Sequence, residues 1–164
     1  MLEKTGVATA KQVREVFPNL ERINKGPVAV IECYQEIPCN PCYKSCHFDA
    51  ITDLSEINTI PEVIEERCTG CGVCVFNCPG LAIMIVDGSV SEDHVLFKIP
   101  YEFTPLPEKG QMVKGLDRSG AYLCDVEVTR VQNAKAMDRT PIIHVMVPRE
   151  HLYAFRNIGL GGKV

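Results

Sequence analysis

The sequence predicts an α+β fold built from three consecutive parts. Residues 1–26 have the pattern of a short helical extension, residues 27–86 contain a cysteine-rich internal repeat, and residues 87–164 have the alternation of a mainly β module. The chain has 164 residues, 46% of them hydrophobic, which suits one ordinary domain or two small ones. The periodicity of apolar residues differs between the three parts, so each is expected to form a different kind of element.

The N-terminal extension, residues 1–26, is expected to contain a short helix. Thr9 followed by Gln12 has the form of a capping box, which opens a helix, and Pro18 is expected to end or kink it. Apolar residues recur between them at helical spacing, at Val13, Val16, Phe17 and Leu20. We expect this stripe to pack on the protein's own domain, although such an extension is also a candidate docking element.

Four cysteines lie close together in residues 68–79, which have the sequence CTGCGVCVFNCP. Their spacing of two, two and three residues, followed by a proline, is that of bacterial [4Fe-4S] ligation runs. Gly70 and Gly72 lack a Cβ, so the backbone there can approach a cluster closely and adopt positive φ. Zinc sites prefer two separated Cys-x-x-Cys pairs. The run therefore favours an iron–sulfur cluster over zinc or free thiols.

An earlier cysteine run repeats the later one when the chain is shifted so that Cys39 falls on Cys71. The segment CNPCYKSCHFDAI at residues 39–51 then coincides with CGVCVFNCPGLAI at residues 71–83 in three cysteines and an Ala-Ile pair. Such a coincidence implies two copies of one supersecondary unit. Apolar segments at 28–32 and 62–66 are expected to form the strand that leads into each run.

With these two runs, residues 27–86 resemble a two-cluster (2[4Fe-4S]) bacterial-type ferredoxin domain, as in iron–sulfur electron-transfer subunits of oxidoreductase complexes. The resemblance implies a ferredoxin-like two-cluster β-α-β repeat, in which the fourth cysteine of each run ligates the other cluster. Cluster B would accordingly be bound by Cys46, Cys68, Cys71 and Cys74. Cluster A would be bound by Cys39, Cys42, Cys78 and one further ligand.

The sequence departs from the family pattern at this eighth ligand. The repeat partner of Cys68 is Glu36, and the nearest cysteine, Cys33, lies three residues earlier. The five residues between Cys33 and Cys39 have ample reach, so the extra length can bulge outward. Because thiolate is the usual ligand of these clusters, we expect Cys33 to complete cluster A. Glu36 as an oxygen ligand and a three-iron cluster are the alternatives.

Two further residues, His47 and Cys124, are considered as candidates for a minor role. His47 occupies the place where the family pattern has proline. We expect it to be a surface histidine, and a hydrogen bond from His47 to a cluster sulfur is the alternative. Cys124 lies outside both runs and is expected to be a free buried thiol, with a redox or ligand role as the minority interpretation.

Residues 87–164 have the pattern of short strands separated by Gly- and Pro-containing turns. Within residues 121–131, apolar and polar residues alternate, which argues for one buried and one solvent-exposed face. Strands are predicted at 82–86, 95–99, 111–116, 121–131 and 141–147, which suggests a small barrel-like module or a twisted sheet. Pro148 is well placed to open a short terminal helix that Gly159 ends.

Composition and charge argue against several functional classes. The first residues lack the apolar segment of a signal peptide, and no apolar run is long enough to span a membrane. The net charge is −4 without a basic patch, so nucleic acid is not an expected partner. A reducing cytoplasm, which keeps cysteines available as thiolates, is the expected compartment. No motif for nucleophilic catalysis or nucleotide binding is recognisable, so no catalytic residue is predicted.

These observations predict an iron–sulfur electron-transfer subunit that relays electrons through two [4Fe-4S] clusters. The residues outside the ferredoxin-like region favour docking to a protein partner in a hetero-oligomer. We expect that partner to be a flavoprotein subunit of a larger oxidoreductase, and an amino acid or amine dehydrogenase would fit the resemblance. The alternatives are a free-standing ferredoxin-type carrier and a redox-sensing iron–sulfur regulatory protein.

Overall fold

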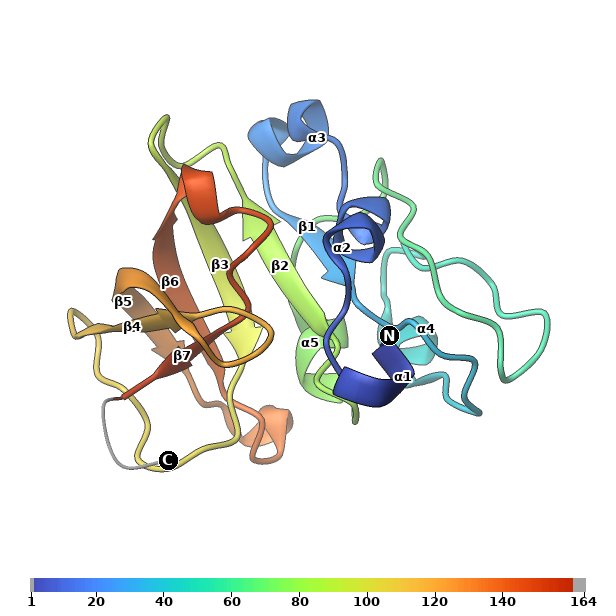
Figure 1. Cartoon of the computed structure of the whole chain (residues 1–164). Coiled ribbons are helices and arrows are strands. Elements are labelled where there is room, and N and C mark those ends of the chain that lie inside the picture. The colour runs from blue at the N-terminus through green and yellow to red at the C-terminus, as the bar shows by residue number, and fades with distance from the viewer. Residues whose placement is uncertain (1, 161–164) are drawn as a thin grey trace.

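The computed structural model describes residues 2–160, within which seven strands form one antiparallel sheet (Figure 1). The strand order is β1-β2-β3-β6-β5-β4-β7. The strands are β1 (Val28–Ile31), β2 (Ile83–Asp87), β3 (His94–Pro100), β4 (Met112–Leu116), β5 (Tyr122–Gln132), β6 (Ile142–Pro148) and β7 (Asn157–Gly159). The helices are α1 (Leu2–Thr5), α2 (Ala10–Val16), α3 (Leu20–Lys25), α4 (Pro41–Ser45), α5 (Val73–Asn77) and the 3₁₀ turns η1 (Lys135–Met137) and η2 (Arg149–His151). The chain is therefore a mixed α and β protein, as predicted.

The N-terminal extension is helical, and its capping box is confirmed. The backbone N–H of Gln12 donates to the Thr9 hydroxyl at 3.3 Å, and the Gln12 side chain accepts from the Thr9 backbone N–H at 2.9 Å. Phe17 ends α2 in an extended conformation, because the proline that follows it disfavours the helical region for the preceding residue. The buried Val13, Phe17 and Ile23 pack into the main core, so the apolar stripe covers the protein's own sheet.

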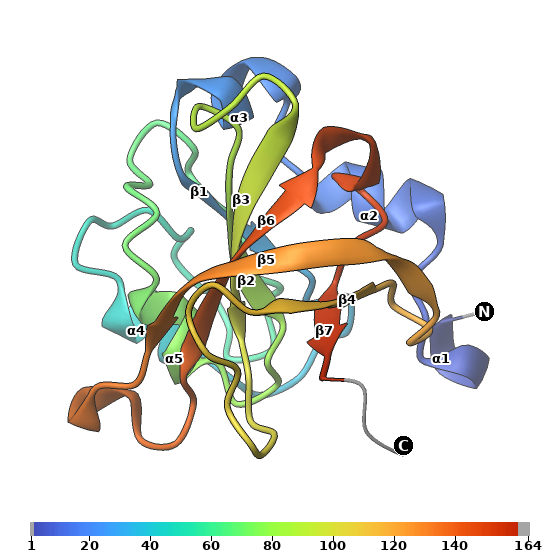
Figure 2. The ribbon, with the colours of Figure 1, turned by 90° about the vertical axis from the view of Figure 1, so that its left-hand side faces the viewer.

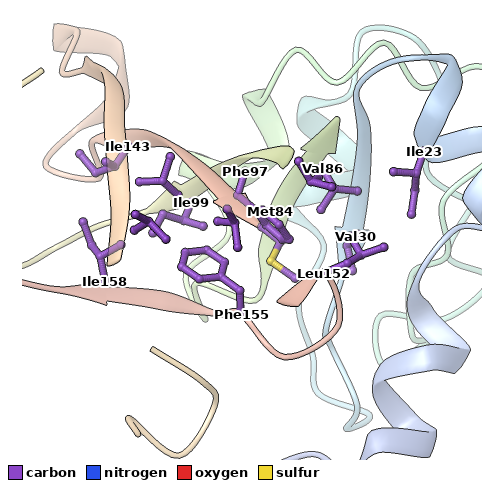
Figure 3. Close-up of a cluster of buried hydrophobic side chains, with 14 of the residues drawn as sticks. Ile23, Val30, Met84, Val86, Phe97, Ile99, Ile143, Leu152, Phe155 and Ile158 are labelled. Carbon is purple, nitrogen blue, oxygen red and sulfur yellow. The ribbon is translucent and has the colours of Figure 1, made fainter. Parts of the chain in front are cut away.

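Strands β1 and β2 are buried on both faces, and they separate two apolar cores. Val28 and Val30 point into the larger core, which continues through Phe97 and Phe155 under the C-terminal strands (Figure 3). Ala29 and Ile31 point the opposite way, into a smaller core that contains cysteine side chains. Because side chains alternate along a strand, the same two strands close the main core on one face and position the cysteine runs on the other.

The C-terminal strands extend this sheet. Strand β3 pairs with β2 through Ile85↔Lys98, Val86↔Phe97 and Asp87↔Leu96, so hydrogen bonding crosses the boundary predicted at residue 87. Figure 2 shows the sheet twisting until β4 and β5 cross over β2 and β3. Among residues 2–160, no strand pairing joins β1 to β7, so the sheet keeps two edges and strand pairing does not close the barrel-like module that was predicted. The domain boundaries themselves stay a prediction.

The predicted terminal helix is wrong beyond its first turn. Only η2 is helical, and the following chain becomes β7, which pairs with β4 through Gly115↔Ile158 and its neighbours. The backbone N–H of Arg156 already donates to the Leu116 carbonyl at 2.8 Å. The edge that β4 offers for pairing and the packing of Phe155 against Phe97 hold this segment in place, and both β4 and Phe97 are distant from it in the sequence.

The predicted strand at residues 62–66 is also reduced, to a single bridge between Val63 and Ile51. The backbone N–H groups of Arg67 and Cys68 both donate to the Ile64 carbonyl, at 3.0 and 3.2 Å. The chain therefore turns directly after the bridge to enter the second cysteine run, which leaves no length for a ladder.

Candidate functional site: two sets of cysteine thiols

From their helices onward, the two cysteine runs adopt the same local backbone. Helices α4 and α5 occupy equivalent positions in the internal repeat, and each is followed by a cysteine, Cys46 or Cys78. Both cysteines have φ −78°, with ψ 109° and 110°. Three residues later, Asp49 and Leu81 both take positive φ, at 46° and 50°. The internal repeat seen in the sequence is therefore also a repeat of backbone conformation.

The strand contacts around the runs follow the same repeat. Ile31 pairs with Ile83 where β1 meets β2, and Val63 pairs with Ile51 in the isolated bridge. The shift that superimposes the two runs also carries Ile31 onto Val63 and Ile51 onto Ile83. Each half thus pairs its first strand with the last strand of the other half, which brings the two runs together.

Four thiols from both runs, here called set B, line one small cavity. Its wall also contains apolar side chains, among them Ala29, Ile51 and Ile85. Burial raises the pKa of the Cys74 thiol to about 12, and negative charge on the other three thiols adds to the shift. The members of set B are Cys46, Cys68, Cys71 and Cys74. They are the four cysteines expected to bind cluster B.

Four other thiols, here called set A, are grouped around Cys42 of α4. Burial raises the pKa of Cys42 to about 11, and charge on the other three members raises it further. Burial likewise raises the pKa of Cys33, with added repulsion from Cys78 and Cys39, so Cys33 lies close to both. The Glu36 side chain is exposed. Set A comprises Cys33, Cys39, Cys42 and Cys78.

Backbone N–H groups point at three of the sulfurs. Ala50 and Ala82, equivalent residues of the repeat, donate to the Sγ atoms of Cys46 and Cys78 at 3.3 and 3.4 Å. In β1, the N–H of Ala29 donates to the Cys68 Sγ at 3.3 Å. Hydrogen bonds to ligand sulfurs stabilise negative charge there and are one means of setting a cluster's reduction potential.

The donor sets fit an iron–sulfur cluster better than a single metal ion. Among residues 2–160, no three His, Cys, Asp or Glu side chains converge on one point as ligands of a single ion would. In a four-iron cluster each thiolate binds a different iron at a different corner, so four separated thiols around a cavity are the expected arrangement. The loop between Cys68 and Cys71 packs closely on Pro27, because Gly70 takes φ +63° and a Cβ there would meet the Pro27 backbone at 2.8 Å.

Several charged side chains that hold the runs in place were not anticipated from the sequence. Arg22 of α3 donates to the carbonyl of Cys68 at 2.7 Å, and Lys98 of β3 donates to that of Gly70 at 2.9 Å. Arg156 donates to the carbonyl of Leu81 beyond the second run. These contacts join residues that are 28 to 75 positions apart, so no local spacing signals them.

A buried ion-pair network joins the first run to the C-terminal strands. The Glu32 carboxylate lies next to Cys33 in the chain and is paired with both Arg118 and Arg156. The Arg118 guanidinium also donates to the Tyr153 carbonyl at 2.7 Å. The Glu32 side chain is only 6% exposed, so this network is a structural connection between two parts of the chain.

The two secondary residues have ordinary surroundings. His47 is exposed, as expected of a surface histidine. Cys124 lies in β5 and is only partly buried, and burial raises the pKa of its thiol. Neither side chain belongs to set A or set B.

Comparison with known proteins gives a family match for the segment that contains the second run. Residues 61–84 match the profile of the 4Fe-4S binding domain family, and this segment contains Cys68, Cys71, Cys74 and Cys78. No solved structure matches the chain. In the described part of the chain, no helix has both the length and the apolar character needed to cross a membrane. The match supports a ferredoxin-type iron–sulfur domain in this part of the chain, and with it iron–sulfur electron transfer in general.

Proposed function

We propose that the chain is an iron–sulfur electron-transfer subunit that relays electrons through two [4Fe-4S] clusters within a larger, flavin-containing oxidoreductase complex. The observation that carries the proposal is the cavity lined by four thiols from both runs, with the other four cysteines of the runs grouped around Cys42. Each set takes one cysteine across from the other run, Cys78 in set A and Cys46 in set B. This crossing is the ligation pattern of two-cluster ferredoxins.

We propose Cys33 as the eighth ligand. Its support is its closeness to Cys78 and Cys39, and its contact with the same small core that contains Cys42. Glu36 has an exposed side chain and lies outside that core. In this proposal a thiol three residues before the repeat position takes the place of the Glu36 carboxylate as the ligand.

The chain's own residues would position and insulate such a pair of redox centres. When bound, each cluster would take up and release one electron. Set B is enclosed by apolar side chains such as Ile51 and Ile85, which keep water away from the sulfurs. Cys71 is exposed at the surface, which gives an electron a short route out of the protein.

Apolar residues on the surface beside both sets are the proposed contacts for redox partners. Phe48, 46% exposed, lines the wall of set B, and Ile57, 49% exposed, accepts a hydrogen bond from the backbone of Cys39 in set A. Contiguous apolar patches mark protein–protein contact sites, whereas single exposed apolar side chains are common on any surface. The position of Phe48 and Ile57 beside the two sets is what makes them the proposed contacts. One such contact at each set suits a relay that receives an electron at one end and releases it at the other.

The proposal is tested by purifying the tagged full-length chain anaerobically from its source organism. We expect a complex that carries flavin absorbance, and bleaching of the iron–sulfur absorbance when the complex's substrate is added. A chain that elutes alone near 18.2 kDa without flavin would instead support a free-standing carrier. A partner that binds or leaves on oxidation of the chain would support a redox-sensing protein.

A matched pair of variants tests the docking contacts in the same preparation. Phe48→Ser should weaken partner binding, because it removes an apolar side chain at set B. Phe103→Ser should leave binding unchanged, because Phe103 is 60% exposed but lies in the loop after β3, away from both sets. Equal effects of the two substitutions would contradict the assignment of the docking surface.

A further inference from the structure

Lys98 stands on the face of the sheet that looks toward set B. In β3 it lies opposite Ile85 of β2 and His144 of β6. Residues directly opposite one another in antiparallel strands project to the same face. Because Ile85 lines the cavity shared by the four thiols of set B, the Lys98 side chain projects toward that set.

The Lys98 ammonium group contacts the loop that carries two of these thiols. It donates to the Gly70 carbonyl at 2.9 Å, and Gly70 lies between Cys68 and Cys71. The loop is held firmly here, because Gly70 packs against Pro27 and Arg22 binds the neighbouring Cys68 carbonyl. The ammonium is therefore fixed beside the sulfurs instead of moving freely at the surface.

No carboxylate among residues 2–160 lies within ion-pair distance of Lys98. The charge of Asp87 acts on Lys98 without a direct contact, and the Asp87 carboxylate accepts from the backbone N–H and hydroxyl of Ser89, at 2.9 and 2.6 Å. Burial lowers the pKa of Lys98, whereas the charges of Asp87, Cys71 and Cys68 oppose that shift.

Two basic residues lie near Lys98 on the same face. His144 donates to or accepts from the Gln132 side chain at 2.6 Å, and burial, with Lys98 and Arg130 nearby, lowers its pKa to about 4, so it is neutral at pH 7. Arg130 pairs with His144 across β5 and β6 and is exposed to solvent. Lys98 is thus the cation of this face that reaches the loop of set B, and Arg22 of α3 is a second cation that binds the same loop.

The charged groups joined to the first run are of a different kind. Arg118 and Arg156 pair with the buried Glu32 carboxylate, which precedes Cys33 in the chain. The helices of the two runs have equivalent backbones, but the C-terminal part of the chain contacts the first run through an ion-paired network and the second run through a lysine without a direct counterion.

We propose that Lys98 is a positioning residue that raises the reduction potential of the cluster held by set B. The inference rests on the proposed function, since it requires a cluster at set B. Reduction adds one negative charge, and a fixed cation in a partly buried, low-dielectric setting stabilises that charge more than it stabilises the oxidised form. Lys98 would thereby bias which of the two clusters holds the electron.

The test is a dithionite titration of the anaerobically purified full-length chain, followed by EPR, on wild type and three variants. At the wild-type midpoint of cluster B, Lys98→Met should lower the ratio of reduced to oxidised cluster about ten-fold, equivalent to about 59 mV for one electron. Lys98→Arg, which keeps the charge, should remain within about three-fold of wild type. Lys114→Met, which removes an exposed lysine of β4, should change neither cluster.

The outcomes separate this inference from the proposed function. Wild-type protein that lacks two reducible clusters would refute the function. Two clusters in wild type, with neither midpoint changed by Lys98→Met, would refute the role of Lys98 alone. If Lys98→Met fails to retain a cluster at set B, Lys98→Gln decides, because its amide can still donate to the Gly70 carbonyl without charge. An unshifted midpoint in Lys98→Gln would refute the inference.

Discussion

The first and second cysteine runs have equivalent helices and equivalent strand pairing, but they differ in the charged groups and the packing around them. Helices α4 and α5 and the cysteines that follow them are equivalent in conformation. The second run lies against the sheet, where Arg22 and Lys98 bind its carbonyl groups. The first run faces the exposed linker at residues 52–61, which contains Ile57 and Ile60. The comparison teaches that the cysteine spacing determines the local shape, while distant residues determine the environment of each set.

The largest expected effect concerns the ligand that breaks the repeat. Cys33→Ala should lower the iron content from about eight to about seven per chain and produce a three-iron EPR signal in the oxidised protein, because set A would keep only three thiols. Glu36→Gln, at the true repeat position of Cys68, should leave the iron content unchanged. If Glu36→Gln lost iron and Cys33→Ala did not, the Glu36 carboxylate would be the ligand and Cys33 would not.

The connection between the first run and the C-terminal strands gives the next largest effect. Glu32→Gln should destabilise the protein by about 3–5 kcal/mol, because it leaves Arg118 and Arg156 buried without a counterion. Glu21→Gln removes only the exposed pair with Lys25 and should leave the stability nearly unchanged, because solvent screens such a pair. Denaturant unfolding under anaerobic conditions measures both, and equal values would show that the buried network does not hold the two parts together.

A smaller effect is expected from the glycines that occur only in the second run. Gly70→Ala should cost about 2–4 kcal/mol, since its Cβ would meet Pro27 and its φ is positive. Gly72→Ala meets only the flexible end of Ile142, at 3.3 Å, and should cost about 1–2 kcal/mol. The equivalent positions of the first run are Pro38 and Asn40, so tight packing on the sheet is specific to the second run. A Gly70→Ala variant as stable as Gly72→Ala would contradict that packing.

The smallest expected effect is a dependence of the protein's stability on pH, caused by His144, which lies in β6 opposite Lys98. The pKa of His144 is lowered to about 4 from its ordinary value of 6.5, first by burial and then by the nearby Lys98 and Arg130. Between these values the unfolded chain binds a proton that the folded protein does not, so stability falls as the pH is lowered through this window. From pH 6.5 to 5 the loss should be about 1–2 kcal/mol in wild type and smaller in His144→Gln. His94→Gln is the control and should keep the wild-type dependence of stability on pH. If His144→Gln also keeps the wild-type dependence, His144 is not a buried neutral ring in the folded protein.

The features that sequence patterns predicted well are the local ones. The capping box at Thr9, the repeat of the cysteine runs and the alternation in residues 121–131 all depend on neighbours a few positions apart, and each corresponds to an element of the structure. The grouping of Cys33 with set A agrees with the expectation from thiolate chemistry, and its role as a ligand stays a prediction.

The features that were missed depend on contacts between distant residues. The segment after Pro148 has helix-forming residues, but the edge of β4 recruits it as a strand. Lys98 appears in the sequence as one polar residue in an alternating strand, and only the register with Ile85 shows that it faces set B. The roles of Arg118 and Arg156 are likewise not visible in the sequence, because their partner Glu32 is at least 86 residues away.

The most direct test of two sets of four thiols is the iron and acid-labile sulfide content of the anaerobically purified chain, together with EPR of the dithionite-reduced sample. Our account predicts about eight irons and eight sulfides per chain and a spectrum broadened by coupling between two nearby paramagnets. About four irons, with the signal of one isolated cluster, would contradict it and would leave the matched segment at residues 61–84 as the site of a single cluster.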